Sequence, residues 1–581
     1  MMLNPRQAHG AIAGVMLLVL SAPAAAQDIL RSRLVAPAEP LTYFDSTREG
    51  IRLLDEQKYP EAAEILQKAV SQYPKDGFVW IRLGQALRLS GKPKEAIAAY
   101  EKGLELTSAW PPAGVRLSLA QSYLAVGNKD MAYRTLERVV QEDQYTQKPA
   151  LYDNPAFAAI RDEPRFQKLV GRIDTSKMSR EEGWRTDIDY LVSEIKRVDH
   201  LYRKQPLPAE LTARQLALKR DVGKLTDEEI YLGLGRMLSP LKQGHVSLGI
   251  LPETARLKVG TIPLQFYAFP EGIFVVRSDE KNSDLVGAEV LKIEDAPPAE
   301  ILKRIEEHSS TENEMKMLWA GMRPLGSIPV LRGLGILKPG RDDVRLTLKL
   351  KDGQAVERVM APVAQEQERK LGPPPSATAP LFVRDVPRAH WLESLPESDA
   401  VFVQVNQIAP DPNESMAEFG LKLRKFLADT PVKNVILDLR HNNGGNTFTY
   451  TEMLRTLVAH STTEGNRLYV IIGRGVYSAT SNLLSDLERL ARPIFVGEPS
   501  SGIGNQDGDE SMTVLPYSGI RALLTSVKWQ YSHPWDLRRS LVPDIPVQLT
   551  AKDYFAGKDS VMETILADIR RAQGGGGAAA R

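Results

Sequence analysis

From Ala400 to Glu498 the chain alternates short runs rich in valine and isoleucine with longer runs of helical periodicity. The β-rich runs are 400–405, 434–440, 467–473 and 493–498, and the helical runs between them are 415–429, 447–460 and 479–491. This alternation predicts a parallel sheet that is buried on both faces. Right-handed crossovers bring the strand-to-helix loops to one edge of such a sheet, where α/β proteins bind ligands. The loops at 440–446, 474–478 and 498–504 are therefore expected to lie together.

Two of these loops carry residues suited to acyl transfer. The first contains the paired glycines Gly444 and Gly445, which allow a strained backbone with exposed N–H groups. The second ends on Ser478 at the start of a helix, where the N–H of Ala479 and the positive end of the helix dipole face the hydroxyl. A nucleophile and backbone donors for an oxyanion are what acyl transfer requires. The alternative interpretation is that Ser478 only caps the helix, a common role for serine.

The N-terminal part of the chain repeats a pattern of small and bulky residues. Ala62, Ala96 and Ala132 mark equivalent positions that are 34 and 36 residues apart. Small residues let two helices cross closely while bulky residues fill the groove, as in a solenoid of helical hairpins. The pattern resembles tetratricopeptide repeats and predicts three of them over 44–142, followed by capping helices over 143–175. Such an array offers a face to a protein partner, or it braces the next module of the same chain.

The first 26 residues have the anatomy of a secretory signal, with a charge at Arg6, an apolar run over 11–20 and a small-residue end at 24–26. The alternative is a membrane anchor, but the apolar run is shorter than the roughly 20 residues that span a bilayer. We therefore expect cleavage before Gln27, a linker over 27–43, and a periplasmic or secreted protein with no integral membrane segment after cleavage.

Composition excludes several classes of function. The chain has no cysteine, which excludes a thiol nucleophile, disulfides and lipoprotein attachment. Its 74 lysines and arginines nearly balance 73 aspartates and glutamates, so nothing favours a nucleic-acid partner. No metal-ligand spacing and no glycine-rich phosphate loop occur in the sequence. We therefore expect neither a metal nor a cofactor.

Four segments in the C-terminal half together resemble the tail-specific (C-terminal processing) protease family. They are VILDLRHNNGG at 435–445, RGVYSATSN at 474–482, VGEPSSGIGNQ at 496–506 and LVPDIPV at 541–547. The resemblance covers about Trp184 to Ile569. It implies a peptidase with a crotonase-like core, Ser478 as the nucleophile, and an oxyanion hole built from the N–H of Ala479 and that of Gly444 or Gly445.

The expected fold class is α+β and multidomain. An all-α helical repeat solenoid precedes a crotonase-like α/β peptidase core that carries a helical cap and a PDZ-like β insertion. The expected ranges are 180–250 for the helical cap, 251–365 for the PDZ-like β-domain, 366–380 for a linker, 381–572 for the protease core and 573–581 for a disordered tail. The PDZ-like match is loose because no clear carboxylate-binding loop precedes it.

The sequence departs from the family at the residue that serves as the general base. Many members activate the serine with a lysine, but Ile503 stands at the matching position and cannot take a proton. His245 matches the position that the tricorn-core and interphotoreceptor-retinoid-binding-protein-like branch fills with histidine. An imidazole with a reference pKa near 6.5 suits a general base at neutral pH. His441 and His533 are the alternatives, because their loops can reach the same edge.

A histidine base needs an acidic residue to orient it. The resemblance to the tricorn-like branch implies Asp536, with Asp509 and Glu510 as alternatives. Gly244 replaces the hydroxyl residue that often precedes the family histidine, so part of the usual relay is missing. Two hypotheses follow: an exported serine peptidase acting on a peptide or protein, with the repeats recruiting a protein partner, or an inactive peptide- or ligand-binding protein on the same scaffold.

Overall fold

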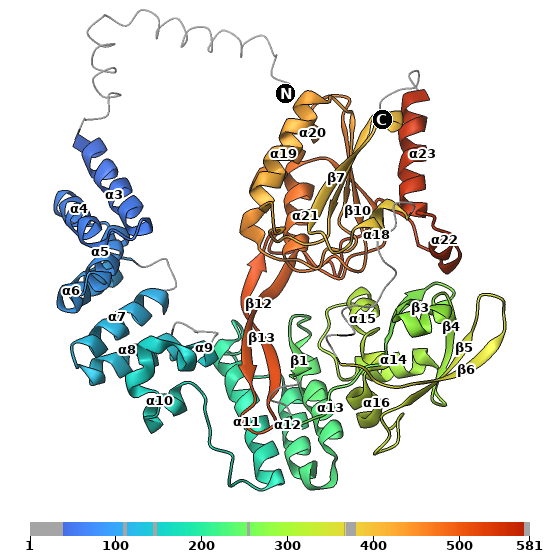
Figure 1. The fold of residues 1–581 in the computed structure, drawn as a ribbon, viewed down its shortest axis with the longest axis horizontal. Helices are drawn as coiled ribbons and strands as arrows, with labels where there is room; N and C mark the ends of the chain where they lie inside the picture. Colours follow the sequence, from blue (N-terminus) through green and yellow to red (C-terminus); the bar gives the residue numbers. More distant parts are fainter. Residues whose placement is uncertain are drawn as a thin grey trace, which may run out of the picture. The chain divides into compact units, whose positions relative to one another are not determined.

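The computed structural model describes residues 39–107, 113–142, 148–251, 256–364, 367 and 379–574 (Figure 1). The chain divides into two compact units, Met1–Tyr145 with Tyr152–Leu169, and Thr146–Leu151 with Val170–Arg581. The predicted signal sequence and most of the two predicted linkers lie outside the described residues. Within the described ranges, no helix is both long enough and apolar enough to cross a membrane.

The smaller unit contains the repeat array. Its helices are α3 (Glu39–Asp55), α4 (Tyr59–Gln72), α5 (Gly77–Leu89), α6 (Pro93–Leu106), α7 (Ala113–Ala125) and α8 (Lys129–Gln141). The turn inside each hairpin contains one residue with positive φ, namely Gln57 (60°), Gly91 (75°) and Gly127 (79°). A left-handed residue ends a helix by satisfying its last carbonyl groups. The period seen in the sequence therefore recurs as a repeated turn geometry.

Small residues allow close helix crossings within this array. A Cβ on Gly50 would lie 2.6 Å from the Leu66 side chain, and a Cβ on Gly84 would lie 2.7 Å from the Tyr100 ring. Leu66 and Tyr100 are both buried. The two bulky residues fill the space left by the glycines, which is the packing expected of a helical-hairpin solenoid.

Short helices cover the end of the array. They are η2 (Pro155–Ile160) and α10 (Pro164–Leu169), with α9 (Lys148–Asp153) at the boundary between the units. The hydroxyl of Tyr133 in α8 donates to Glu163 at 2.7 Å, and the Phe157 and Phe166 rings are fully buried. These contacts cover the apolar end that the last repeat would otherwise expose.

The core of the larger unit is a six-stranded sheet with the strand order β14-β11-β10-β9-β8-β7. Its strands are β7 (His390–Leu395), β8 (Ala400–Val405), β9 (Asn434–Asp438), β10 (Arg467–Ile472), β11 (Pro493–Gly497) and β14 (Ile545–Pro546). All adjacent pairs are parallel except β7–β8. The predicted parallel sheet is confirmed, with one antiparallel edge strand that the sequence did not indicate.

Helices cover both faces of this sheet. Val401 and Val403 of β8 pack with α19 (Met416–Asp429), α20 (Thr451–Ser461) and α21 (Ala479–Leu490), whereas Phe402 packs with α23 (Ser560–Gly574) on the other face. Alternate side chains of a strand point to opposite faces, so a strand buried on both faces is apolar throughout.

The cap combines helices with a long hairpin from the core. Helices α11 (Arg180–Val198), α12 (Ala209–Asp221) and α13 (Asp227–Leu238) are followed by β1 (Ser247–Ile250). Strand β1 pairs with β13 (Ile520–Gln530), which pairs with β12 (Asn505–Val514). Figure 1 shows β12 and β13 running from the core towards the cap helices. This hairpin was not predicted.

The β-domain is a five-stranded antiparallel sheet. Its strands, in sheet order, are β2 (Leu264–Phe269), β3 (Gly272–Ser278), β4 (Glu289–Ile293), β5 (Val344–Lys349) and β6 (Ala355–Met360). Helices α14 (Pro298–Glu306), α15 (Glu314–Ala320) and α16 (Ile328–Gly333) lie between β4 and β5 in the chain. Short helices α18 (Leu381–Arg384) and α22 (Ala551–Phe555) belong to the core.

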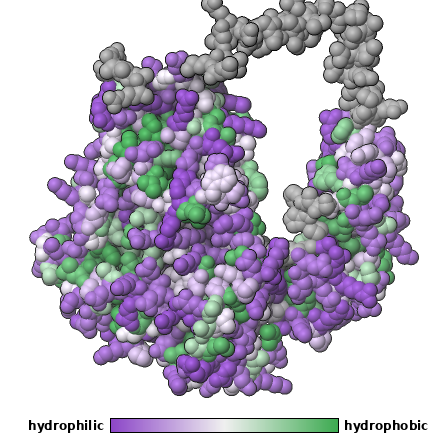
Figure 2. All heavy atoms as spheres, turned by 180° about the vertical axis from the view of Figure 1, so that it is seen from behind, coloured by the Kyte–Doolittle hydropathy of each residue, from purple (hydrophilic) through white to green (hydrophobic). Residues whose placement is uncertain are grey.

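Two element ends differ from the expected ranges. Helix α3 begins at Glu39, inside the predicted linker, and α23 continues to Gly574, inside the predicted tail. Helix α23 ends on the polar and small residues 570–574, so its apolar periodicity fades before the helix ends. On the face drawn in Figure 2, hydrophilic residues predominate and hydrophobic residues form separate patches.

The tip of the hairpin depends on one buried carboxylate. Asp187 of α11 is fully buried and accepts hydrogen bonds from the backbone N–H groups of Tyr517 and Ser518, both at 2.8 Å. Asp187→Ala leaves both donors unpaired and should lower the free energy of unfolding by about 3 kcal/mol. Denaturant unfolding followed by tryptophan fluorescence measures the change. Asp189→Ala, at an exposed position on the same helix, is the control, and an equal effect of both variants would contradict this assignment.

Candidate functional site

The loop after β9 is held in place by one buried asparagine. The side-chain oxygen of Asn442 accepts from the N–H of Gly444 at 3.0 Å and from the Thr480 hydroxyl at 2.6 Å. Its amide nitrogen donates to the Val405 carbonyl at 3.0 Å. These bonds connect the ends of β8 and β9 to the first turn of α21, so the loops lie together at the carboxyl edge of the sheet as predicted from the crossover rule.

Ser478 has a backbone conformation that only the surrounding structure can impose. Its φ is 54° and its ψ is −131°, a region that residues with a side chain rarely adopt. A sharp strand-to-helix turn of this kind raises a serine hydroxyl above the sheet in α/β-hydrolases. The side chain makes no capping hydrogen bond to α21. The interpretation that Ser478 merely caps its helix is therefore wrong.

Gly444 lies directly against Ser478. A Cβ on Gly444 would lie 2.6 Å from the Ser478 Cβ and 3.2 Å from its hydroxyl oxygen, and Gly444 has a φ of 117°. Any larger residue would displace the serine. The N–H of Gly444 is already bound to Asn442, however, so the prediction that it serves as an oxyanion donor does not fit. The N–H groups of Gly445 and Ala479 donate to no atom of the described residues and remain the candidate donors.

His245 lies beside the residue that precedes the serine. Its Nδ1 is 2.9 Å from the Tyr477 hydroxyl, and the two rings are tilted with centroids 4.4 Å apart. Its Nε2 is buried and has no hydrogen-bond partner in the described part of the chain. The expected hydrogen bond between His245 and Ser478 is therefore absent from this structure.

Tyr477 sets the tautomer of His245. Its hydroxyl donates to the Glu312 carboxylate at 2.9 Å, and the N–H of Gly244 donates to the same oxygen at 2.7 Å. A hydroxyl has one proton to give, so towards His245 the Tyr477 oxygen accepts and Nδ1 carries the hydrogen. The lone pair of the imidazole is then on Nε2, the arrangement that a general base requires.

A lysine lies in the same cluster. Lys316 has 6% of its surface exposed, and its ammonium is 3.2 Å from the centroid of the Tyr477 ring. Burial lowers the pKa of Lys316 to about 8, against the opposing effect of Glu312 and Glu510. Burial, and then the charge of Lys316, lower the pKa of His245 to about 3. His245 is therefore neutral at physiological pH.

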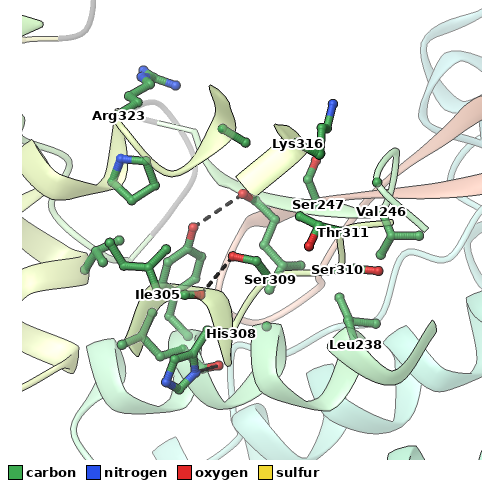
Figure 3. A pocket seen from close by; sticks show the side chains of 18 residues that line it. Leu238, Val246, Ser247, Ile305, His308, Ser309, Ser310, Thr311, Lys316 and Arg323 are labelled. Atoms are coloured by element: carbon green, nitrogen blue, oxygen red, sulfur yellow. Dashed lines mark hydrogen bonds between the residues drawn. The ribbon is translucent and has the colours of Figure 1, made fainter. Parts of the chain in front are cut away.

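Lys316 also lines a cavity of about 280 Å³ between α13, β1 and the segment that follows α14 (Figure 3). Ser247, Ser310 and Thr311 contribute hydroxyls to its wall. In Figure 3 the nitrogen of Lys316 points away from Ser309. The ammonium thus belongs to the cluster around Tyr477 rather than to the hydroxyl-lined part of the cavity.

The structure does not place Asp536 at His245. Its carboxylate accepts from the Ser532 hydroxyl at 2.6 Å and pairs with Arg538, and these hydrogen bonds hold its pKa well below the usual range. The prediction that Asp536 orients the base is wrong, because the turn that carries it folds against its own neighbours. Of the alternatives, Glu510 lies nearest, with its oxygen 3.9 Å from Nε2 of His245.

The other candidate histidines have different partners. Nε2 of His441 is 2.9 Å from the Phe382 carbonyl, and its ring stacks on Phe382. The ring of His533 stacks on Trp535 at 5.2 Å. Neither histidine is hydrogen-bonded to Ser478 in the described part of the chain, and His441 is held neutral because burial lowers its pKa to about 4.

Reasoning from sequence missed three members of this site: Tyr477, Glu312 and Lys316. Tyr477 adjoins the nucleophile in sequence, which is a usable signal. Glu312 and Lys316 are four residues apart, next to the start of α15, and look like an ordinary helical ion pair. Only the fold brings them to a loop about 165 residues further along the chain.

A small pocket opens beside Ser478. Its volume is about 200 Å³, and it is lined by Gly445, Asn446, Thr447, Phe448, Ser478, Ala479, Asn482, Gln506, Asp509 and Trp529. Both candidate oxyanion donors are among these residues. Within the described ranges, no group of three histidine, aspartate or glutamate side chains is arranged to hold a metal ion.

Residues 53–113 match the tetratricopeptide-repeat family. These residues, from α3 to the start of α7, are therefore similar to tetratricopeptide repeats. The peroxisomal targeting signal receptor of Komagataella phaffii is 36% identical over 98 residues, which is 17% of this chain and 17% of that receptor. The match therefore spans about a sixth of the curated relative.

Solved structures of CPAF have the fold of the larger unit. A CPAF mutant aligns with a TM-score of 0.52 and 12% identity over 69% of this chain and 99% of that chain. Mature CPAF complexed with lactacystin aligns with a TM-score of 0.51 and 13% identity over 68% and 99%. A photosystem II D1 C-terminal processing protease aligns over 64% and 94% at 14% identity, with a TM-score of 0.33 that is too low to carry an argument. The α+β multidomain fold expected from the resemblance to tail-specific proteases is confirmed.

The charge of Lys316 should be measurable at His245. Lys316→Met removes the positive charge and should raise the pKa of His245 from about 3. The folded-state pKa lies below the unfolded value of about 6.5, so the unfolded chain binds this proton first and stability falls as the pH drops from about 6.5 towards 3. NMR titration of the imidazole, assigned with His245→Gln, measures the shift. Lys303→Met, at an exposed position of α14, is the control, and an unchanged His245 pKa in Lys316→Met would contradict the placement of Lys316 beside His245.

Proposed function

We propose that this chain is a serine peptidase that uses Ser478 as its nucleophile. The observation that carries the proposal is the strained backbone of Ser478, whose hydroxyl does not cap its helix although it stands at the helix start. Strain at a residue with a nucleophilic side chain points to function, because the fold has to supply the energy that keeps it. The motif resemblance to tail-specific proteases supports the same reaction class.

The chemistry would follow the usual course of acyl transfer. Ser478 attacks the carbonyl of a scissile peptide bond, and its proton passes to Nε2 of His245 and then to the leaving amine. The oxyanion forms between the N–H groups of Gly445 and Ala479. His245 has to approach the hydroxyl when substrate binds, or act through one water, because catalytic hydrogen bonds often tighten only in the complex.

The low pKa of His245 makes its imidazole a weak general base, and the negative charge of Glu510 would offset this weakness. Protonation of Nε2 creates a positive charge 3.9 Å from the Glu510 carboxylate. Bound substrate excludes water from this charge pair and strengthens the attraction. Tyr477 and Glu312 keep the ring in the tautomer that leaves Nε2 free.

The repeat array would recruit a protein partner or substrate. Tetratricopeptide arrays present a curved face to peptides, and the curated relative that matches here is a receptor for a targeting signal. The wider proposal is thus a peptidase whose substrates are delivered, or selected, by a separate unit of the same chain.

A second candidate function is binding without turnover. Two observations favour it: Ile503 replaces the family lysine, and no hydrogen bond joins His245 to Ser478. On this account the pocket beside Ser478 holds a peptide or ligand that is released unchanged.

Variants of the three central residues separate these functions. Ser478→Ala should abolish fluorophosphonate labelling and peptide hydrolysis, and His245→Gln should lower both by at least about 100-fold. Tyr477→Phe removes the bond that fixes the tautomer and should lower kcat more than it raises KM. Ser485→Ala, about two turns further along the same helix, is the matched control. Hydrolysis that persists at full rate in Ser478→Ala would exclude the serine mechanism, and no Ser478-dependent labelling or turnover in the parent protein would favour binding.

Export is part of the proposal and rests on the signal-like segment at 1–26. When the full chain is expressed in a Gram-negative bacterium, the mature protein should begin at Gln27 and fractionate with the periplasm. N-terminal sequencing measures the cleavage site. A chain lacking 11–20 is the control and should stay in the cytoplasm with its N-terminus uncleaved, and an intact N-terminus on the full chain would rule out cleavage.

A further inference from the structure

The pocket beside Ser478 carries a single charge. Among the described residues that line it, Asp509 is the only ionisable group, and its carboxylate forms no ion pair within the described part of the chain. Asp507, two positions earlier on the same strand, differs in this respect, because it pairs with Lys528 and His200. Burial raises the pKa of Asp509, and its hydrogen bond with Trp529 opposes that shift. The pocket therefore presents a carboxylate without a cationic partner close to the proposed nucleophile.

Backbone geometry explains why Asp509 reaches this pocket. Gln506 and Asp509 lie three positions apart on β12, so in a regular strand their side chains would face opposite sides. Asp509 has a φ of 52°, which breaks the alternation and lets both side chains line the same space. The strained conformation thus places a carboxylate where a regular strand would not.

Gln506 adds an acceptor that has no donor. Its amide nitrogen donates to the Ser478 carbonyl at 2.6 Å and to the Asn482 side chain at 3.0 Å, which fixes the orientation of the amide. Its amide oxygen is buried and has no hydrogen-bond partner in the described residues, and the residue is 1% exposed. A buried acceptor of this kind calls for a donor from outside the protein.

Two aromatic rings form the rim. Phe448 is 75% exposed, and its ring centroid is 6.1 Å from that of Trp529 in an edge-to-face arrangement. Aromatic faces attract cations as well as apolar groups, and the apolar stem of a lysine or arginine packs against them.

We infer that this pocket binds the side chain of a lysine or arginine next to the scissile bond. An ammonium or guanidinium would donate to Asp509 and to the free oxygen of Gln506 while its stem packs against the Phe448 and Trp529 rings. An acidic side chain would meet the Asp509 charge, and an apolar one would leave the Gln506 oxygen without a donor and Asp509 without a cationic partner. This inference rests on the proposed function and names the substrate class for that same site.

Three peptidyl phosphonate probes test the selection. They carry lysine, norleucine or glutamate at the position next to the phosphorus, so that norleucine matches the length of lysine without its charge. The lysine probe should label Ser478 roughly tenfold faster than the norleucine probe, and the glutamate probe should be slowest. Asp509→Asn keeps the size and tolerates positive φ, and it should reduce the lysine preference to less than about threefold. The matched control is Asp399→Asn, another aspartate with positive φ (49°), which lies before β8 at the opposite edge of the sheet.

A binding measurement separates failure of this inference from failure of the proposed function. In Ser478→Ala, calorimetry should show a lysine-containing peptide binding roughly tenfold more tightly than its norleucine counterpart, and Asp509→Asn should remove the difference. Equal labelling and equal binding of the lysine and norleucine ligands would overturn the inference while leaving the peptidase proposal intact. Selective binding without any labelling would uphold the lysine pocket and count against catalysis.

Discussion

The proposed site depends on the hydrogen bonds of the Tyr477 hydroxyl, because this residue joins three parts of the larger unit. The hydroxyl binds His245 at the end of the cap and Glu312 beside the β-domain, and the Tyr477 backbone is part of the loop that carries Ser478. A buried hydroxyl with a carboxylate on one side and an imidazole on the other has no freedom to reverse its bonds. The cap and the β-domain therefore fix the tautomer of a residue on which the core would depend for catalysis.

On the proposed function, the Tyr477 cluster would take the place of two family residues that this chain lacks. Ile503 removes the usual base and Gly244 removes the usual hydroxyl beside the histidine, yet the N–H of Gly244 now binds the carboxylate that receives the Tyr477 proton. Burial and Lys316 make His245 hard to protonate, which keeps the ring neutral but weakens it as a base. The balance between these effects decides whether the site turns over substrate or only binds it.

Much of the fold could be predicted from the chain alone. The valine-rich runs place β8 to β11 correctly because a strand buried on both faces must be apolar at every position. The alanine spacing predicts the repeat array because helical hairpins need small residues where they cross. The hairpin β12–β13 was missed, because its outward residues are polar and its strands bury only part of their length. The antiparallel strand β7 was missed because an edge strand needs no unbroken apolar run.

For the candidate site, the sequence by itself predicted Ser478 as nucleophile, the glycine pair beside it and His245 as base, since these predictions rest on residue types within short segments. Only the tertiary structure decided the partners. In the folded chain the Asp536 carboxylate accepts from Ser532, and the N–H of Gly444 donates to Asn442. Glu312 and Lys316 both lie against Tyr477. The physical reason is that hydrogen-bond partners and pKa values depend on distance and burial across elements far apart in the chain, which no local pattern encodes.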